Sequence, residues 1–316
     1  MPSLSVFVLS LLISGLALLI ERKVGIGWDF HPDVVTYITE NSSVIESGWM
    51  ALPNQLYYFI ANWVGGDVSI LISLNIIAYS LTNVLITKAY LNYSFSNTAI
   101  NRGAIFKLMV LGWLLFTPYR LHLAIHGLKD SFIILSLCTF SYYHGRTAYS
   151  WLAWIPLLLL RVYASFYALL FVRGRFIVLG MLVVLIGITF FDFSMLEFLQ
   201  ERNETDMRAR EFDTIPPFSE LGLLGTFLRM IIWPLLIVSG AFAVISPALL
   251  FIPVAIEVVL SRIWSRYVLG NWGLTVGIVL CMMIIAAFVN SFTAYIRYVY
   301  PVLIIAPVIM MRRKMD

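Results

Sequence analysis

Long apolar stretches recur along almost the whole chain, and they constrain its fold more than any other feature. An α-helix needs about 20 consecutive apolar residues to cross the hydrocarbon core of a bilayer. The sequence therefore predicts an all-α, polytopic transmembrane helical bundle of about ten spans (range roughly 8 to 11), in a single domain over residues 1–316. The predicted spans are 4–20, 68–88, 103–119, 121–142, 148–172, 176–192, 221–241, 244–260, 271–289 and 292–311.

The composition agrees with a membrane protein and excludes several other classes. Only 12% of the residues are charged and 61% are hydrophobic, whereas soluble domains carry about 25% charged residues. A soluble enzyme and a disordered chain are excluded on this ground. The net charge of +4 is explained by basic cytoplasmic loops, so we expect no nucleic-acid partner. Cys138 and Cys281 lie in apolar stretches without disulfide or metal-binding spacing.

The distribution of Lys and Arg predicts the orientation of the chain. With the N-terminus inside and every stretch crossing, most basic residues between the spans fall on the inner side, as the positive-inside rule requires. Both termini are then cytoplasmic in a plasma (inner) membrane, and 21–67 is an external loop. The side of the membrane on which the polar loop 193–219 lies stays open. If 148–172 enters and leaves the membrane on the same side, the loop becomes external, and the ratio of inner to outer Lys and Arg residues barely changes. The first span lacks a cleavage site and is expected to be retained.

The first external loop carries an acidic motif, which two predicted helices follow. Asp29, His31 and Asp33 lie close together just beyond the first span. Paired carboxylates can supply a general base and a helper group, or bind a metal ion. We expect a helix from Asp33 to Ser47, capped by Asp33, and an interfacial helix over 53–64, which is aromatic and too short to span.

Ionisable residues inside the predicted spans form a second pattern. His122, His126 and Lys129 share one face of a helix that opens the span 121–142. Such residues are costly in a bilayer and usually face an internal cavity. Asp130 is expected to offset the charge of its neighbour Lys129 or of Arg120. Because Arg donors match phosphate oxygens, we expect a group that binds the phosphate of a leaving group: Arg120, His122, His126, Lys129, Asp130, Arg161, Arg297 and Tyr298.

The acidic motif gives the chain a resemblance to a known class of enzymes. An acidic motif after the first span, followed by helices along the membrane surface, is similar to the GT-C class of glycosyltransferases. These enzymes take sugars from polyprenyl-phosphate or pyrophosphate carriers, and an Asp or Glu of the first external loop typically serves as their catalytic base. The resemblance implies that Asp29 or Asp33 is the base, with His31 between them.

The polar stripe also resembles a second, related group. The Arg120-x-His122 segment, the later Lys129-Asp130 pair and the pair Arg297-Tyr298 are similar to parts of bacterial O-antigen and exopolysaccharide polymerases, which join lipid-linked repeat units on the outer face. The chain lacks a clearly large external loop late in the sequence. Whether it is a polymerase or a single-sugar transferase therefore stays open.

The expected function is polysaccharide biosynthesis at the outer face of the plasma (inner) membrane. A sugar or repeat unit passes from a polyprenyl-linked donor to a hydroxyl of a glycan or a lipid-linked acceptor. No cofactor is expected; a divalent metal stays open, although no dense acidic cluster indicates one. The alternative is a secondary transporter of an anionic solute, which predicts inverted repeats and helices broken at matching positions of two halves. A non-catalytic scaffold would leave the clustered charges unexplained.

Overall fold

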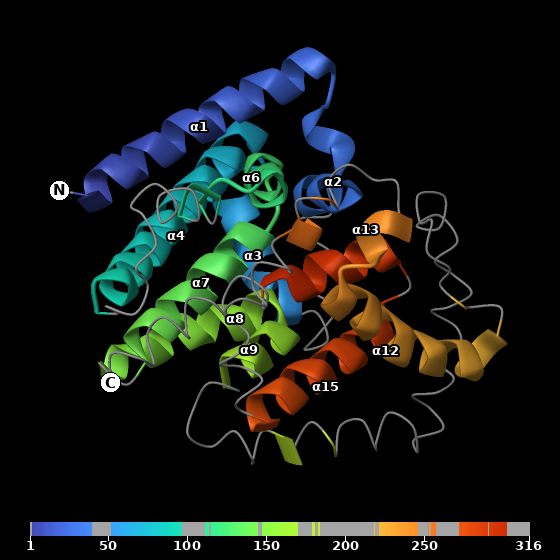
Figure 1. The fold of residues 1–316 in the computed structure, drawn as a ribbon. Helices are drawn as coiled ribbons and strands as arrows, with labels where there is room; N and C mark the ends of the chain where they lie inside the picture. Colours follow the sequence, from blue (N-terminus) through green and yellow to red (C-terminus); the bar gives the residue numbers. More distant parts are fainter. Residues whose placement is uncertain are drawn as a thin grey trace. The chain divides into compact units, whose positions relative to one another are not determined.

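The described part of the chain is all-helical, as the sequence predicts (Figure 1). The chain divides into two compact units, Met1–Ser165 with Val308–Asp316 and Phe166–Pro307. The computed structural model describes residues 2–39, 52–96, 111–113, 115–144, 147–169, 179–180, 183, 218, 221–245, 252, 254–256, 272–289 and 291–301.

Three described helices are long and apolar enough to cross a membrane. They are α1 (Pro2–Val24), α4 (Val68–Ser96) and α12 (Gly222–Ser239). They coincide with three of the predicted spans, and their length and composition indicate a membrane protein. A further apolar helix, α15 (Trp272–Phe288), has 17 residues. Residues 292–301 are also helical.

Several predictions lie wholly or mainly outside the described residues. They concern the spans 103–119, 176–192 and 244–260, the polar loop 193–219, the second half of 292–311, and residues 40–47 of the helix expected in the first loop.

Two short helices follow the first span, in agreement with the pattern predicted for the external loop. Helix α2 (Pro32–Thr39) begins at a proline, a residue favoured in the first turn of a helix. Asp33 therefore lies inside the first turn of α2, and the predicted cap at Asp33 is wrong because the helix begins one residue before it. Helix α3 (Leu52–Trp63) confirms a helix over the residues 53–64, and its predicted position in the membrane interface stays a prediction. Phe59 and Trp63 are exposed on it, as expected for a helix that lies along a membrane surface.

Helix α4 is the centre of the first unit. It packs against α1, α6 (Pro118–Ile125) and α7 (Asp130–Tyr143), and Figure 1 shows α1 running alongside it. Asn75, Tyr79 and Asn83 recur every four residues, so they share one face of the helix. All three are buried. A buried polar face needs partners on the neighbouring elements.

The Asn83 amide ties two helices to α4. Its Nδ2 donates to Ser10 Oγ of α1 over 3.0 Å, and its Oδ1 accepts a hydrogen bond from Arg120 of α6. Arg120 also donates to the Leu115 carbonyl, and its guanidinium carbon lies 5.0 Å from the centroid of the Tyr79 ring. This distance allows a cation–π contact. Asn83 thus holds α6, through Arg120, and α1, through Ser10, against the polar face of α4.

The predicted span 121–142 is broken into two helices. Helix α6 ends at Ile125, and α7 begins at Asp130. Gly127 lies between them with φ +64°, a left-handed conformation that glycine adopts at no steric cost. Its carbonyl accepts a hydrogen bond from the buried Tyr57 hydroxyl of α3, which satisfies part of the interrupted backbone. The expectation of one continuous helix carrying a polar stripe is therefore wrong.

The predicted span 148–172 is interrupted in a similar way. It consists of η4 (Ala148–Ala153), α8 (Trp154–Leu160) and α9 (Val162–Leu169). Arg161 separates the last two in an extended conformation, with φ −162° and ψ 114°. Helix α8 packs against α3 and α7, and these contacts keep the interruption inside the first unit.

In the second unit, α12 packs against α15 around a buried arginine. Arg229 donates to Thr226 Oγ1 over 3.2 Å and to the Ala287 carbonyl of α15 over 3.5 Å. Its guanidinium carbon lies 5.8 Å from the centroid of the Trp233 ring. A short helix, α13 (Phe242–Ile245), follows α12. Arg229 therefore links two apolar helices through a backbone carbonyl.

The left-handed turn between α6 and α7 gives a test of the fold. We predict that Gly127→Ala lowers the free energy of unfolding by about 1–2 kcal/mol, because a Cβ is strained in that conformation. The added atom itself would meet side chains no closer than 3.6 Å, so backbone strain dominates. Gly15→Ala is the control, since Gly15 lies within α1 with open space around its Cβ position. Unfolding in detergent micelles measures both, and equal stabilities would contradict the prediction.

Candidate functional site

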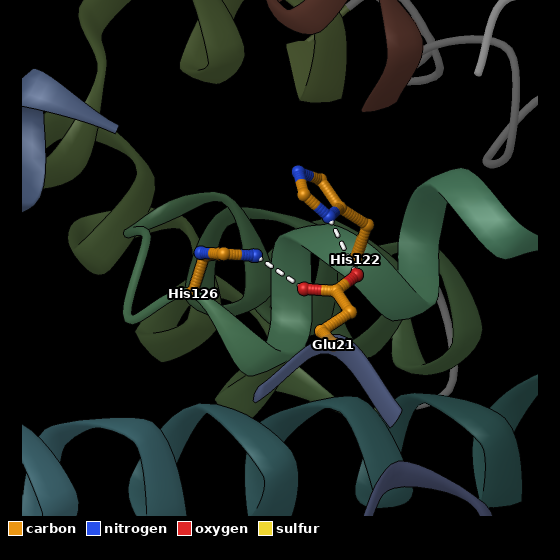
Figure 2. Close-up of side chains that lie close together, drawn as sticks. All are labelled: Glu21, His122 and His126. Atoms are coloured by element: carbon orange, nitrogen blue, oxygen red, sulfur yellow. Dashed lines mark hydrogen bonds and ion pairs between the residues drawn. The ribbon is translucent and has the colours of Figure 1, made fainter. Parts of the chain in front are cut away.

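Three of the four histidines of the chain gather near one carboxylate. Glu21 lies in the last turn of α1. His122 lies on α6, and His126 follows one turn later, directly after the last residue of that helix. His122 Nδ1 is 2.9 Å from Glu21 Oε1, and His126 Nε2 is 2.6 Å from Glu21 Oε2. Figure 2 shows the carboxylate reaching both imidazoles at once. One carboxylate thus joins the end of the first helix to α6.

His31 extends this arrangement. Its Nε2 lies 3.0 Å from His122 Nε2, so one of these two imidazoles donates and the other accepts. The Phe30 ring centroid lies 5.1, 5.8 and 5.7 Å from those of His31, His122 and His126. The polar groups form a hydrogen-bonded chain from His31 through His122 and Glu21 to His126, called the Glu21 cluster below.

The helical face of α1 explains why Glu21 points at α6. Ser10, Ser14 and Glu21 share one face of that helix at 100° per residue. Both serines are fully buried, and Ser10 is bonded to α4. Leu12 and Leu16 lie on the opposite side and are exposed, as expected for a surface that meets lipid. The polar face of α1 docks on the first unit, so its last polar residue lies against α6.

The electrostatics of the cluster are unusual for a helix end. A carboxylate in the last turn of a helix opposes the macrodipole, which favours cations there. The hydrogen bonds from the two imidazoles compensate for this position of Glu21. His122 and His126 are almost fully buried, whereas the Glu21 side chain is 21% exposed. The carboxylate is therefore accessible while its partners are fixed.

The cluster has the groups for two kinds of chemistry. A carboxylate and imidazoles within hydrogen-bond distance can accept and relay a proton. Glu21, His122 and His126 also offer three ligand atoms that lie within 4.8 Å of one another, so they could hold a metal ion. Sequence reasoning named no metal ligand, because these residues are separated by about a hundred positions.

The structure brings together some of the predicted site residues and places others apart. His31, His122 and His126 meet, but the carboxylate hydrogen-bonded to the last two is Glu21, which sequence reasoning missed. Asp29 lies in η1 (Trp28–Phe30), exposed, with its carboxylate folded against Gly27. The position of Glu21 on the polar face of the first helix is the signal that could have found it.

The predicted phosphate-binding residues fall into several groups. Arg161 Nη1 pairs with Asp130 Oδ1 at 2.8 Å, and both side chains are buried. This ion pair joins the break at Arg161 to the first turn of α7. Lys129 is also buried, with Nζ 5.7 Å from the centroid of the Tyr37 ring. Two buried cations, Lys129 and Arg161, thus lie at the two helix breaks.

Two predicted members of this group belong to the second unit. The Arg297 guanidinium carbon lies 5.9 Å from the centroid of the Tyr298 ring. Their participation in a site with the Glu21 cluster stays a prediction. Arg120, by contrast, belongs to the first unit and engages Asn83.

The function of the chain is inferred from the geometry of its described residues, because comparisons with known proteins give no match. No protein-family model, curated protein or solved structure was found to match the chain. The resemblance to GT-C enzymes and to polysaccharide polymerases therefore stays a prediction.

The Asp130–Arg161 pair gives a quantitative test of the site's framework. We predict that Asp130→Asn or Arg161→Gln lowers the free energy of unfolding by about 3–5 kcal/mol, because each leaves a buried charge without its partner. The double variant should lose clearly less than the sum of the single losses. Unfolding of all four proteins in the same detergent measures this coupling, and strictly additive losses would contradict a direct ion pair.

Proposed function

We propose that this chain is a membrane-embedded transferase. It moves a sugar or repeat unit from a polyprenyl-(pyro)phosphate donor to a hydroxyl acceptor at the outer membrane surface. The observation that carries the proposal is the Glu21 cluster, a partly exposed carboxylate bonded to two buried imidazoles at the end of the first apolar helix. A donor from the lipid phase and an acceptor from water can both reach such a position.

The cluster supplies the acid–base chemistry that this transfer requires. The acceptor oxygen attacks the anomeric carbon of the donor and forms the new glycosidic bond. The bond from that carbon to the phosphate oxygen breaks, and the phosphate leaves with the bonding electrons. The proton of the acceptor hydroxyl passes to the Glu21 cluster, where the carboxylate and the imidazoles share it.

The buried cations support the binding of a leaving phosphate. Lys129 precedes α7, whose first backbone N–H groups and positive dipole end favour an anion. Arg161 lies at the neighbouring break and is held by Asp130. We assign phosphate binding to this region of the first unit, with Arg120 as a further proposed member. Burial strengthens such contacts because water screens them less.

A secondary transporter of an anionic solute is the second candidate. The breaks between α6 and α7 and between α8 and α9 favour it, since transporters bind substrates at interrupted helices. Both of these breaks lie in the first unit, and matching breaks in the other half stay a prediction of this candidate. Sealed proteoliposomes distinguish the candidates, because uptake of the labelled anion without glycosidic-bond formation identifies a transporter.

The transferase proposal predicts a specific loss of activity. Glu21→Gln should lower kcat for transfer from a polyprenyl-linked donor by about 10²–10⁴-fold, because an amide cannot accept the proton. Asp67→Asn is the matched control. Asp67 Oδ1 accepts the N–H of Ser69 at the start of α4, and Asn caps a helix as well as Asp does. Labelled sugar transfer in proteoliposomes measures both.

The same assay tests the base that the sequence predicts. If Asp29→Asn or Asp33→Asn abolishes transfer while Glu21→Gln retains it, the base lies in the loop motif and the role of Glu21 is refuted.

The proposal also predicts the side of the membrane on which the cluster lies. A cysteine introduced at the exposed Lys23 should react with an impermeant maleimide in intact cells. The native Cys138 and Cys281 are buried and are replaced by alanine to remove background. A cysteine at Asp316 should react only after the cells are permeabilised, because the C-terminus is expected inside. The reverse labelling pattern would contradict an external site.

A further inference from the structure

We infer that the Glu21 cluster binds one divalent transition-metal ion, with Glu21, His122 and His126 as ligands and zinc as the favoured metal. The inference rests on the proposed function, because it adds a metal ion to the same site. Metal binding is measured without an activity assay, so the metal site and the transferase function can fail separately. The ligand atoms come from two helices and already lie within 4.8 Å of one another.

The ligand types select the class of metal. Two imidazole nitrogens and one carboxylate oxygen form a set used by catalytic zinc sites, which leave a further position for water or substrate. Imidazole also suits other transition metals, whereas Mg²⁺ and Ca²⁺ prefer oxygen ligands. The set therefore favours zinc over the alkaline-earth ions that a purely acidic motif would bind.

The distances allow a metal to enter with small side-chain movements. Neighbouring ligand atoms of a tetrahedral zinc site lie about 3.4 Å apart, as follows from metal–ligand bonds of about 2.1 Å. The nitrogens of His122 and His126 now lie 2.9 and 2.6 Å from the Glu21 oxygens. Each contact would lengthen by less than about 1 Å when a metal replaces the shared protons.

A second contact supports the assignment of His122 as a ligand. Metal-bound imidazoles usually donate their other N–H to a neighbouring group, which fixes the tautomer and the ring orientation. If His122 binds through Nδ1, its Nε2 carries the proton and can donate to His31 Nε2, 3.0 Å away. His31 is thus a positioning residue.

The site also has the surroundings of a reactive metal centre. Glu21 keeps 21% of its side chain exposed, which leaves a way in for an ion and a hydroxyl ligand. The Phe30 ring packs near all three imidazoles and gives the site an apolar side. A divalent ion there would polarise a bound hydroxyl and ease its deprotonation, which is the step that the proposed transfer needs. The proton would then pass to the Glu21 oxygen that does not bind the ion.

Zinc titration of the purified full-length chain tests the inference. After chelator treatment in detergent, calorimetric titration with Zn²⁺ should show one ion bound per chain, and Mg²⁺ should give no comparable signal. Glu21→Gln and His126→Asn should weaken zinc binding by more than about 100-fold, and His31→Asn by about 10–100-fold. Binding should also weaken as the pH falls, because the imidazoles must lose their protons.

The fourth histidine supplies the matched control. His144 caps the end of α7 and stacks on Phe140, outside the Glu21 cluster. His144→Asn should leave the zinc affinity unchanged. Gel filtration and unfolding temperature establish that each variant is folded. Glu21→Gln preserves the size of the side chain, so weaker zinc binding by a folded Glu21→Gln variant reflects the loss of the carboxylate ligand.

Each outcome decides the inference. Absence of stoichiometric zinc binding overturns it, as does binding that a folded Glu21→Gln variant retains or that His144→Asn weakens equally. Sugar transfer by a protein that binds no zinc would support the proposed transferase function and overturn the metal site. Zinc binding at the cluster in a chain that transfers no sugar would support the metal site and overturn the transferase proposal.

Discussion

The hydrogen bonds from His122 and His126 to the Glu21 carboxylate are the interaction on which the first unit depends. Helix α1 exposes most of its apolar side chains, so apolar packing alone fixes its position poorly. Ser10 anchors its middle to α4, and Glu21 anchors its end to α6. The carboxylate also compensates for burying two imidazoles, which would otherwise lose their hydrogen bonds to water. The position of α1 and the proposed chemistry therefore depend on the same three side chains.

The helix breaks place the charged residues of the interior. A continuous helix satisfies its own backbone, whereas each break exposes polar groups that need partners inside the protein. The Tyr57 hydroxyl bonds to the carbonyl of Gly127 at one break, and the Asp130–Arg161 pair links the other to α7. Lys129 lies beside these contacts. The region is therefore a fixed polar interior within an apolar chain, as binding an anionic group requires.

The sequence predicted the elements that depend on local composition and missed those that depend on distant partners. The long apolar helices α1, α4 and α12 and the aromatic helix α3 follow from length and hydropathy alone. The breaks at Gly127 and Arg161 do not, because the groups that stabilise them come from other helices.

The candidate site was predictable only in part, because local composition is visible in the sequence and contacts between distant residues are not. His31, His122 and His126 stood out as ionisable groups beside or within apolar stretches. Their convergence joins positions 91 or more residues apart, which no spacing rule detects. Glu21 was missed because it stands at the first position of the predicted loop beside Arg22 and Lys23, where a charged residue is ordinary. Its helical face, shared with Ser10 and Ser14, would have pointed to it.

A density map of the full chain in lipid nanodiscs, at a resolution that shows side chains, tests the central claim most directly. The expected result is a Glu21 carboxylate within hydrogen-bond distance of both His122 and His126, or joined to them through a metal ion, at the level of the outer head groups. A Glu21 side chain directed into water or toward the lipid head groups, with the two histidines bonded to other residues, would contradict the claim.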